Sequence, residues 1–346
     1  MKIGLIGCGR ISGAHLKIYR LLGNVEVVAV SEVDAERGKA FAAKNGISAD
    51  RVFTDYTKLM EIKDLDFLDV CTPPSTHASI VCDAAKYGHN VLVEKPMALS
   101  TDECDRMIHE VKKHGTHLCI CHNQIFFPAM RKAKQMVDSG YLKLVSFRTS
   151  VRENPNLYGV PAWNTSPKEK GLVWEVGCHP AYLQLHFLGD VTEVYAVGNK
   201  AKYPVFDEFN VLLRTAGQPC GIMEVSWLAG ETEKVYEIND ADGKRVFMIS
   251  PPPIANEGYD TLLEKSGVAE TSLFSEFKKT FHRHVKTKMS LGYYLGHFYL
   301  ISSYVKSLTD DAPPPVQPED GRRTVALLES IEESLNTHKV VDVRAQ

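Results

Sequence analysis

The sequence of 346 residues contains no apolar run that approaches the roughly 18 residues of a membrane-spanning helix. Its first residues, MKIGLIGCGR, return to polar side chains after a very short apolar run, which predicts a strand and not a signal peptide. The eight cysteines form no CxxC pair and no dense framework, so we expect reduced, mostly buried thiols. The net charge of -3 offers no basic excess for nucleic acid or acidic membranes. These absences indicate a cytoplasmic protein whose partners include neither nucleic acid nor a membrane.

Residues 1–121 alternate short apolar runs with longer amphipathic stretches. The apolar runs are rich in Val, Ile and Leu and occupy residues 2–7, 25–30, 66–72, 90–94 and 117–121. Stretches with the helical spacing of apolar residues lie between them and end in glycine, the common residue after a helix, at 11–23, 34–46, 76–88 and 101–115. This alternation predicts an α/β domain whose parallel sheet is covered by helices on both faces.

Residues 122–346 change to runs of strands without intervening helices. Strands are expected at 143–151, 193–200, 209–216, 219–228, 235–240 and 244–250, and NDADGK (239–244) predicts a hairpin turn between the last two. Helices are expected at 128–140, 173–189, 273–287, 293–308 and 320–335. We therefore expect a second, α+β domain with a mostly antiparallel sheet, whose C-terminal helix is free to pack back on the first domain.

A glycine-rich turn joins the first expected strand to the first expected helix. Gly7 permits a tight turn, Gly9 lets the backbone approach a pyrophosphate, and Ser12 is a small replacement for the third glycine of a G-x-G-x-x-G pattern. Glu32 follows about 20 positions on, where a carboxylate accepts hydrogen bonds from the adenosine ribose and repels a 2′-phosphate. The pattern predicts dinucleotide binding and favours NAD over NADP. The expected cofactor contacts are Gly7, Cys8, Gly9, Arg10, Ile11, Ser12 and Glu32.

Further motifs follow the turn along the chain. They are Asp69-Val70-Cys71-Thr72-Pro73-Pro74 with Ser75-Thr76-His77, then Glu94-Lys95-Pro96, and then Glu175-Val176-Gly177-Cys178-His179. In this order, and with the closing helix that begins at Asp320, they make the chain resemble the glucose–fructose oxidoreductase, inositol dehydrogenase and rhizopine catabolism family (Gfo/Idh/MocA). The resemblance spans nearly the whole chain, and the Glu-Lys-Pro block combined with Thr-Pro-Pro-x-x-His is its most specific part.

The resemblance implies an N-terminal Rossmann domain, a doubly wound parallel sheet at 1–121, and a substrate and oligomerisation domain at 122–346 with an open, mostly antiparallel sheet. It implies a homodimer or homotetramer formed through the C-terminal sheet. It also implies NAD(P) at the C-terminal ends of the Rossmann strands and a carbohydrate-like substrate held between the domains. The cofactor contacts implied are Thr72, Pro73, Pro74, His77, Glu94 and Lys95.

The resemblance also carries three catalytic roles to this chain. Lys95 would bind the substrate hydroxyl and stabilise alkoxide character, and the peptide bond to Pro96 is expected to be cis. His179 would act as general base or acid. On a helix that begins near Trp174, Glu175 would share a face with His179 and orient its imidazole.

Three departures from the family pattern indicate an unusual substrate pocket. Glu175 stands where the family has aspartate, Tyr182 where it often has an acidic residue, and Asn123 begins a stretch where an arginine is common. The long polar loop at 153–171 suits either a polyhydroxylated ring or an ordinary surface or subunit contact. The expected substrate contacts are Lys95, Asn123, Arg152, Trp163, Glu175 and His179, with Tyr158 and Asn164 in the same loop.

The segment Cys119-Ile120-Cys121-His122 resembles a metal site only superficially. On a strand the two cysteines share one face while His122 points to the other, and no second cluster completes a zinc sphere, so we expect no metal. The expected function is oxidation of a secondary alcohol on a sugar, cyclitol or sugar derivative. A glycosidase or lyase that oxidises transiently around a tightly bound NAD, and a non-catalytic NAD-binding sensor, stay open as alternatives. A sensor needs neither Lys95 nor His179.

Overall fold

The computed structural model describes residues 1–155, 162–217, 219–250, 261–265 and 294–343. Its contacts divide the chain into two compact units, residues 1–122 with 297–325 and residues 123–296 with 326–346. The helix expected at 273–287, together with Tyr158, lies outside the described residues. Within the part of the chain that is described, no helix combines the length and apolar character needed to cross a membrane.

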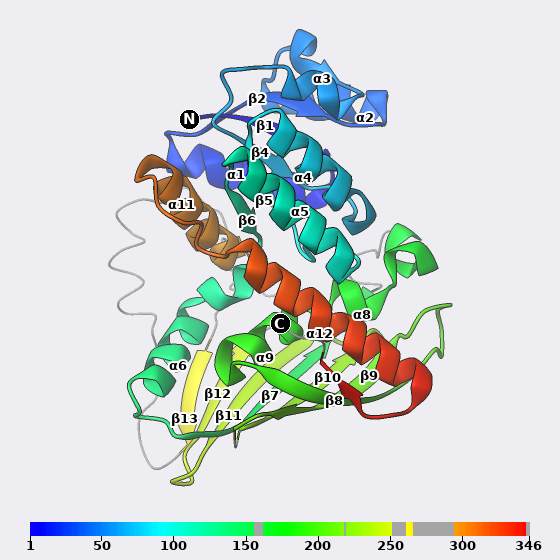
Figure 1. Ribbon diagram of the computed structural model, residues 1–346, viewed down its shortest axis with the longest axis vertical. Coiled ribbons are helices and arrows are strands. Elements are labelled where there is room, and N and C mark those ends of the chain that lie inside the picture. Colours follow the sequence, from blue (N-terminus) through cyan, green and yellow to red (C-terminus); the bar gives the residue numbers. More distant parts are fainter. Residues whose placement is uncertain (156–161, 218, 251–260, 266–293, 344–346) are drawn as a thin grey trace. The chain divides into compact units, whose positions relative to one another are not determined.

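The first unit is built on a six-stranded sheet in the order β3-β2-β1-β4-β5-β6 (Figure 1). Its strands are β1 (Lys2–Ile6), β2 (Glu26–Ser31), β3 (Val52–Phe53), β4 (Phe67–Val70), β5 (Asn90–Val93) and β6 (Leu118–Ile120). Every neighbouring pair is parallel. The strand order reverses between β1 and β4, which is where a doubly wound sheet opens its ligand-binding edge. The predicted Rossmann architecture is confirmed.

Helices cover both faces of this sheet. They are α1 (Arg10–Leu22), α2 (Ala35–Asn45), α3 (Tyr56–Met60), α4 (His77–Lys86), α5 (Thr101–His114) and α11 (Leu295–Thr309). Tyr19 of α1 and Tyr304 of α11 both contact the ring of Phe67 on β4, with centroids 6.1 and 5.3 Å away, so these two helices share a face. The helices α3, α4 and α5 pack together on the other face (Figure 1).

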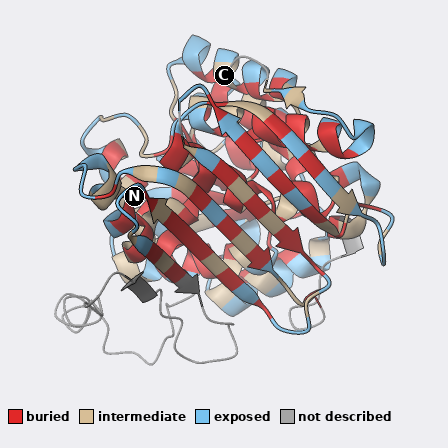
Figure 2. Cartoon of the chain, turned by 90° about the horizontal axis from the view of Figure 1, so that it is seen from below, coloured by how far each residue is buried: buried red, intermediate tan, exposed pale blue. Residues whose placement is uncertain are grey.

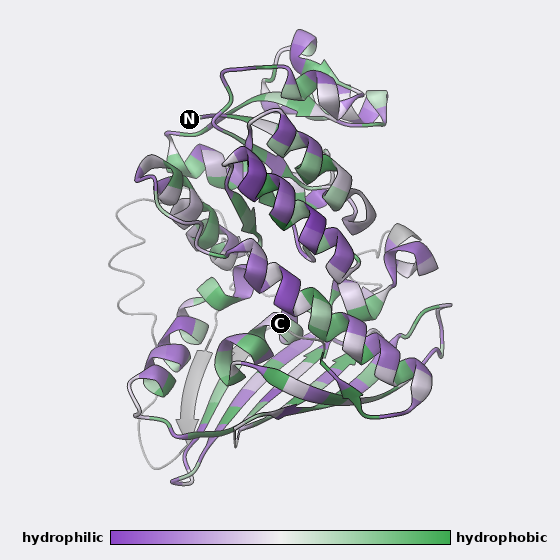
Figure 3. Ribbon diagram, viewed as in Figure 1, coloured by the Kyte–Doolittle hydropathy of each residue, from purple (hydrophilic) through white to green (hydrophobic). Residues whose placement is uncertain are grey.

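Local signals explain where these helices begin and end. The Asp34 side chain accepts the Arg37 N–H at the start of α2, and the Ser100 hydroxyl accepts the Glu103 N–H at the start of α5. Acidic residues occupy the first turn of α5 and basic residues its last turn, which suits the helix dipole. The outward face of α5 is polar (Figure 3), while its buried residues follow helical spacing.

The second unit is built on an eight-stranded sheet in the order β13-β12-β11-β7-β10-β9-β8-β14. Its strands are β7 (Leu144–Arg152), β8 (Val191–Asn199), β9 (Glu208–Thr215), β10 (Cys220–Ser226), β11 (Glu233–Asp240), β12 (Arg245–Ser250), β13 (Thr261–Lys265) and β14 (Val341–Asp342). Only β7 and β10 pair in parallel among these strands, so the sheet is mixed but mostly antiparallel, as predicted. The predicted hairpin joins β11 to β12, with Asn239 opposite Arg245.

One face of this second sheet carries helices. They are α6 (Pro128–Asp138), α8 (Leu172–Glu175), α9 (Cys178–Leu188) and, from residue 326 on, α12 (Pro318–Thr337). Gln184 of α9 donates to the carbonyl oxygens of Phe147 and Ile222, and the rings of Phe187 and Phe147 lie 4.5 Å apart. Exposed and buried residues alternate along several of the strands, so the opposite face of the sheet is the exposed one (Figure 2).

The single helix expected at 173–189 is wrong, because the chain forms α8 and α9 with a break between them. Gly177 occupies the break. A Cβ there would lie 2.4 Å from the Val173 carbonyl oxygen and 2.9 Å from the Phe209 ring. Glu175 therefore ends α8 while His179 lies in the first turn of α9, and the two residues do not share a helical face as expected.

Short 3-10 helices complete the described elements and position several candidate residues. They are η1 (Ala49–Arg51), η2 (Pro74–Thr76), η3 (Asn123–Phe126), η4 (Ala162–Thr165) and η5 (Pro167–Glu169). Because η2 directly follows the end of β4 and leads into α4, it lies at the carboxyl edge of the first sheet. This edge carries the candidate residues of the first unit.

Candidate active site

The turn after β1 is tight at one glycine and open at the next. Gly7 has a φ of +92°, and a Cβ on it would lie 2.7 Å from the Cys71 carbonyl oxygen. Its N–H donates to the Ser31 carbonyl over 2.8 Å, which joins the turn to the end of β2. At Gly9, which precedes α1, a Cβ would meet nothing within 4 Å. The fold therefore requires glycine at position 7 but leaves space above position 9.

The side chains around this turn face mostly inward. Ser12 is fully buried, and its hydroxyl donates to the Gly7 carbonyl over 2.7 Å, which holds the turn against the first helical residues. The Cys8 thiol is buried, and burial followed by the Glu32 charge raises its pKa to about 12, so it stays protonated. Arg10 is exposed and Ile11 is half-buried at the start of α1.

Glu32 follows β2 and is only 6% exposed. Its carboxylate accepts the Cys8 N–H over 2.9 Å, the Asp34 N–H over 3.1 Å and an Arg37 guanidinium N–H over 2.5 Å. Burial alone would raise the pKa of Glu32, but these hydrogen bonds, with that from Arg37 the strongest, lower it. A carboxylate that is ionised at neutral pH therefore lies beside the glycine turn.

The turn fits the diphosphate of a dinucleotide. No side chain caps the N-terminus of α1, and its first turn contains no acidic residue, so its leading N–H groups are left for a ligand. The space above Gly9 is where a Cβ would intrude on that ligand. The residues present thus suit the diphosphate of a nicotinamide dinucleotide.

Two loops at the same sheet edge are tied together by His77. Thr72 and Pro73 are half-buried after β4, and Pro74 is buried at the start of η2. His77 is fully buried; its Nδ1 lies 2.9 Å from the Pro96 carbonyl oxygen and its Nε2 lies 2.9 Å from that of Thr72. Its ring therefore positions both loops and offers no free edge to solvent. The Lys95–Pro96 peptide bond is cis, as the resemblance implied.

A chain of buried ionisable groups leads to Lys95. The Tyr19 hydroxyl donates to Asp69 over 2.8 Å, Asp69 lies 2.9 Å from His15 Nδ1, and His15 Nε2 lies 3.1 Å from Glu94 Oε1. Glu94 Oε2 then accepts the Lys95 N–H over 3.1 Å. Sequence reasoning assigned no role to His15 or Asp69, although Asp69 begins one of the quoted motifs.

The ionisation of these buried groups follows from the partners that each one has. Burial opposes a charge on His15, but the adjacent Asp69 prevails and raises the pKa of His15 well above its ordinary value. Burial likewise opposes ionisation of Glu94, but the close approach of His15, 3.1 Å away, and its charge lower the pKa of Glu94 far below its ordinary value. Glu94 is therefore an anion behind the half-buried Lys95.

In the second unit, His179 belongs to a hydrogen-bonded network. Its Nδ1 lies 2.8 Å from the Tyr182 hydroxyl, which donates to Asn123 Oδ1 over 3.3 Å and accepts the Gln124 N–H over 3.0 Å. If His179 donates through Nδ1, its Nε2 is left as the basic nitrogen. The network brings the predicted residues Asn123 and His179 together through Tyr182. The sequence alone did not predict that Tyr182 contacts either residue.

The remaining candidates of the second unit are placed differently. Arg152 lies on the exposed face of the second sheet, where its Nε is 3.7 Å from Glu224, while α9 covers the opposite face. The structure does not bring Arg152 together with His179. Glu175 is half-buried at the end of α8. The backbone of Trp163 lies in η4, and its side chain is outside what the structure describes.

Comparison with protein families decides the chain's membership. Residues 1–122 match the model of an oxidoreductase family with an NAD-binding Rossmann fold, and residues 130–244 match the GFO/IDH/MocA C-terminal domain. The chain belongs to the Gfo/Idh/MocA family. The expected membership is confirmed, and with it the assignment of the chain as an oxidoreductase.

Members of the Gfo/Idh/MocA family with similar sequences and structures are known. An uncharacterized oxidoreductase YrbE of Bacillus subtilis is 29% identical over 59% of each chain, so the match spans less than two thirds of that relative. Myo-inositol 2-dehydrogenase of Thermotoga maritima is 24% identical over 99% of this chain and 98% of its own. The WlbA dehydrogenase from Bordetella pertussis, solved with NADH and UDP-GlcNAcA, has a TM-score of 0.85 at 21% identity, with 100% of this chain and 98% of its own covered. This structural likeness establishes the fold.

Proposed function

We propose that this member of the Gfo/Idh/MocA family transfers hydride between a nicotinamide cofactor and a secondary alcohol of a sugar, cyclitol or sugar derivative. The observation that carries the proposal is the shared sheet edge: the glycine turn after β1 and the Glu94–Lys95 loop after β5 both follow strand ends of one parallel sheet. The Thermotoga relative is named as a dehydrogenase of myo-inositol, a cyclitol, which supports the substrate class.

The proposed cofactor is NAD in preference to NADP. Glu32 is ionised and lies against the Cys8 N–H of the glycine turn, so it suits a ribose with free hydroxyls and repels a 2′-phosphate. Arg37 already pairs with this carboxylate, which reduces its attraction for a phosphate. The bound nicotinamide would supply the hydride acceptor or donor.

The chain's own residues would manage the substrate hydroxyl and its proton. Lys95 would bind the reacting oxygen through its ammonium group, and Glu94 behind it holds the loop through the Lys95 N–H. His179 would accept the hydroxyl proton at Nε2, while Tyr182 fixes the ring from the Nδ1 side. Glu175, as a carboxylate close in sequence, would favour the protonated imidazole, and Asn123 would bind a second hydroxyl.

The test measures NADH formation, followed by the absorbance of the reduced nicotinamide, with a panel of sugars, sugar acids and cyclitols as substrates. Lys95→Ala and His179→Ala are each expected to lower kcat/KM by about a hundredfold or more, since positioned acid–base groups supply that much. Lys86→Ala, an exposed lysine paired with Asp83, is the matched control and should keep wild-type activity.

A double variant tests whether Lys95 and His179 act on one substrate. If they do, Lys95→Ala combined with His179→Ala should cost little more than the worse single variant, because groups that act as a unit are not additive. Activity that survives both substitutions contradicts the site. Absence of turnover across the panel, with NAD retained through purification, would instead favour internal redox hydrolysis or a sensor.

We further propose that copies of the chain associate through the exposed face of the second sheet. Exposed apolar side chains gather there on neighbouring strands, with Tyr195 and Val197 on β8 and Leu212 on β9. A dimer or tetramer built on this face would cover them.

A further inference from the structure

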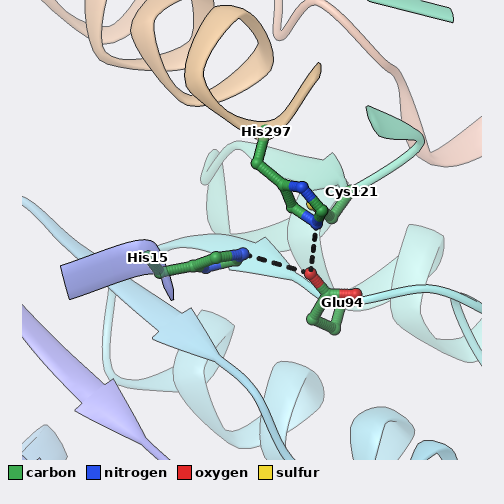
Figure 4. A group of neighbouring side chains, drawn as sticks. All are labelled: His15, Glu94, Cys121 and His297. Atoms are coloured by element: carbon green, nitrogen blue, oxygen red, sulfur yellow. Dashed lines mark ion pairs between the residues drawn. The ribbon is translucent and has the colours of Figure 1, made fainter. Parts of the chain in front are cut away.

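Four side chains from separate elements of the first unit converge in its interior (Figure 4). His15 comes from α1, Glu94 and Cys121 follow β5 and β6, and His297 comes from α11. One nitrogen, oxygen or sulfur atom from each lies within 4.8 Å of every other. All four residues are buried, and none is more than 6% exposed.

The closest pair in this cluster lacks a hydrogen bond. His15 Nε2 lies 3.1 Å from Glu94 Oε1, yet both atoms are buried without a hydrogen-bond partner. The Nδ1 side of the same ring is bound to Asp69 over 2.9 Å. A proton on Nε2 would therefore be poorly directed at the carboxylate. A neutral ring would instead aim its lone pair at an anionic oxygen, which is unfavourable in a buried site unless a cation lies beside both atoms.

The four side chains suit a bound divalent metal ion better than they suit a shared proton. Two imidazoles, a carboxylate and a thiolate form a tetrahedral ligand set typical of zinc. His297 Nε2 lies 3.8 Å from the same Oε1 of Glu94. Bonds of about 2.0–2.3 Å around a tetrahedral ion place its ligand atoms about 3.3–3.8 Å apart, so the four atoms need only small shifts to reach that geometry.

Two features beyond the four ligands also support a metal ion at this cluster. Asp69 holds the distal nitrogen of His15, the arrangement that usually orients a metal-binding histidine. The charges also balance, because one carboxylate and one thiolate neutralise a divalent ion when both imidazoles are neutral. Glu94 Oε2 stays bound to the Lys95 N–H, so the ion would fix the loop that carries Lys95.

We propose that His15, Glu94, Cys121 and His297 bind one zinc-class divalent cation. With four protein ligands the site is closed and structural, so no step of the proposed reaction passes through the ion. The proposal reverses the sequence-based expectation of no metal. The four ligands lie far apart along the chain, and none of the usual ligand spacings signals the site.

The test is elemental analysis of the full-length protein, purified without a metal-affinity step and dialysed. About one zinc per chain is expected in the wild type. Cys121→Ser and His297→Gln should each lose most of it. Cys119→Ser is the matched control, because Cys119 is equally buried on β6 but lies outside the cluster, and it should retain the metal.

Cobalt substitution gives a second readout, and its first part needs only the wild type. Cobalt added to metal-stripped wild type should produce a thiolate-to-cobalt charge-transfer band, which Cys119→Ser keeps and Cys121→Ser loses. Wild type that carries no zinc and binds no cobalt overturns the proposal and leaves a protonated His15 as the buried cation. Metal retained by Cys121→Ser with an unchanged spectrum overturns it as well. Neither outcome depends on dehydrogenase activity.

Discussion

Gly7 and Gly9 lie in one turn but meet different surroundings, which separates folding from cofactor binding. In Gly7→Ala the alanine must adopt a φ of +92°, and its Cβ must approach the Cys71 carbonyl oxygen. We therefore expect the unfolding free energy to fall by at least about 1–2 kcal/mol. Gly9→Ala should leave stability unchanged but weaken NAD binding about tenfold, because its Cβ enters the space expected for the diphosphate. Thermal unfolding and NAD titration measure the two effects. Equal stability losses in both variants would contradict this assignment.

Glu32 is expected to set the choice between NAD and NADP. Glu32→Gln removes the negative charge and releases Arg37, so NAD binding should weaken about tenfold while NADP binding improves. Asp34→Asn is the control, since Asp34 is half-exposed beside the same arginine and asparagine caps a helix equally well. Dissociation constants for both cofactors provide the readout. An unchanged ratio in Glu32→Gln would remove Glu32 from the ribose site.

At the scale of elements, α9 carries a histidine that should make stability depend on pH. Burial, reinforced by the charge of Lys134, lowers the pKa of His186 to about 4. The unfolded chain takes up this proton near pH 6.5, while the folded chain resists it. The stabilising contribution is therefore complete above pH 6.5 and is lost as the pH falls towards 4, by at most about 1.4 kcal/mol per pH unit.

His186→Gln should remove this dependence. The difference in unfolding midpoint between variant and wild type should change across pH 4–6.5 and stay constant above it. The control is His109→Gln, because the His109 side chain is 73% exposed on α5 and its substitution should leave the pH profile unaltered. A parallel shift of the His186→Gln profile at all pH values would show that packing alone is affected.

The elements that sequence patterns predicted are those that form a continuous apolar run or show a helical period. Strands β1, β2, β4, β5 and β6 and the longer helices between them were predicted correctly from apolar runs and helical spacing, whereas β3 has only two half-buried residues and forms no such run. The break between α8 and α9 was missed because the apolar pattern continues across it. Gly177 is required there by the Val173 carbonyl and the Phe209 ring, and a contact with a distant strand leaves no local signal.

The candidate site, too, was predictable from the sequence only in part. The glycine turn, with Glu32 beside it, was predictable because one short strand–turn–helix segment carries the whole pattern. Tyr182 reaches Asn123 only through the fold, and His15 meets His297 only when α11 packs beside α1. Such contacts join residues that are far apart in the sequence. A single sequence therefore predicts the local motifs but not the partners that position them.

At the scale of the whole molecule, the exposed face of the second sheet predicts self-association. Leu212 is 58% exposed in β9 and lies opposite Tyr195 on one side and Ile222 on the other. If copies pair through this face, Leu212→Glu would bury a charge without a partner at a cost of several kcal/mol, about enough to dissociate the assembly. Light scattering after size exclusion should then report an oligomer for wild type and a monomer for the variant.

The control for this substitution is Val33→Glu in the first unit. Val33 is 83% exposed, so it receives the same charge at a more solvated apolar position. Because neither residue supports a core, both variants should keep the wild-type unfolding midpoint, and any change of mass can be assigned to the contact surface. A monomeric wild type, or an oligomer that survives Leu212→Glu, would place the association elsewhere. A mass lowered only by Leu212→Glu would identify this face as the interface.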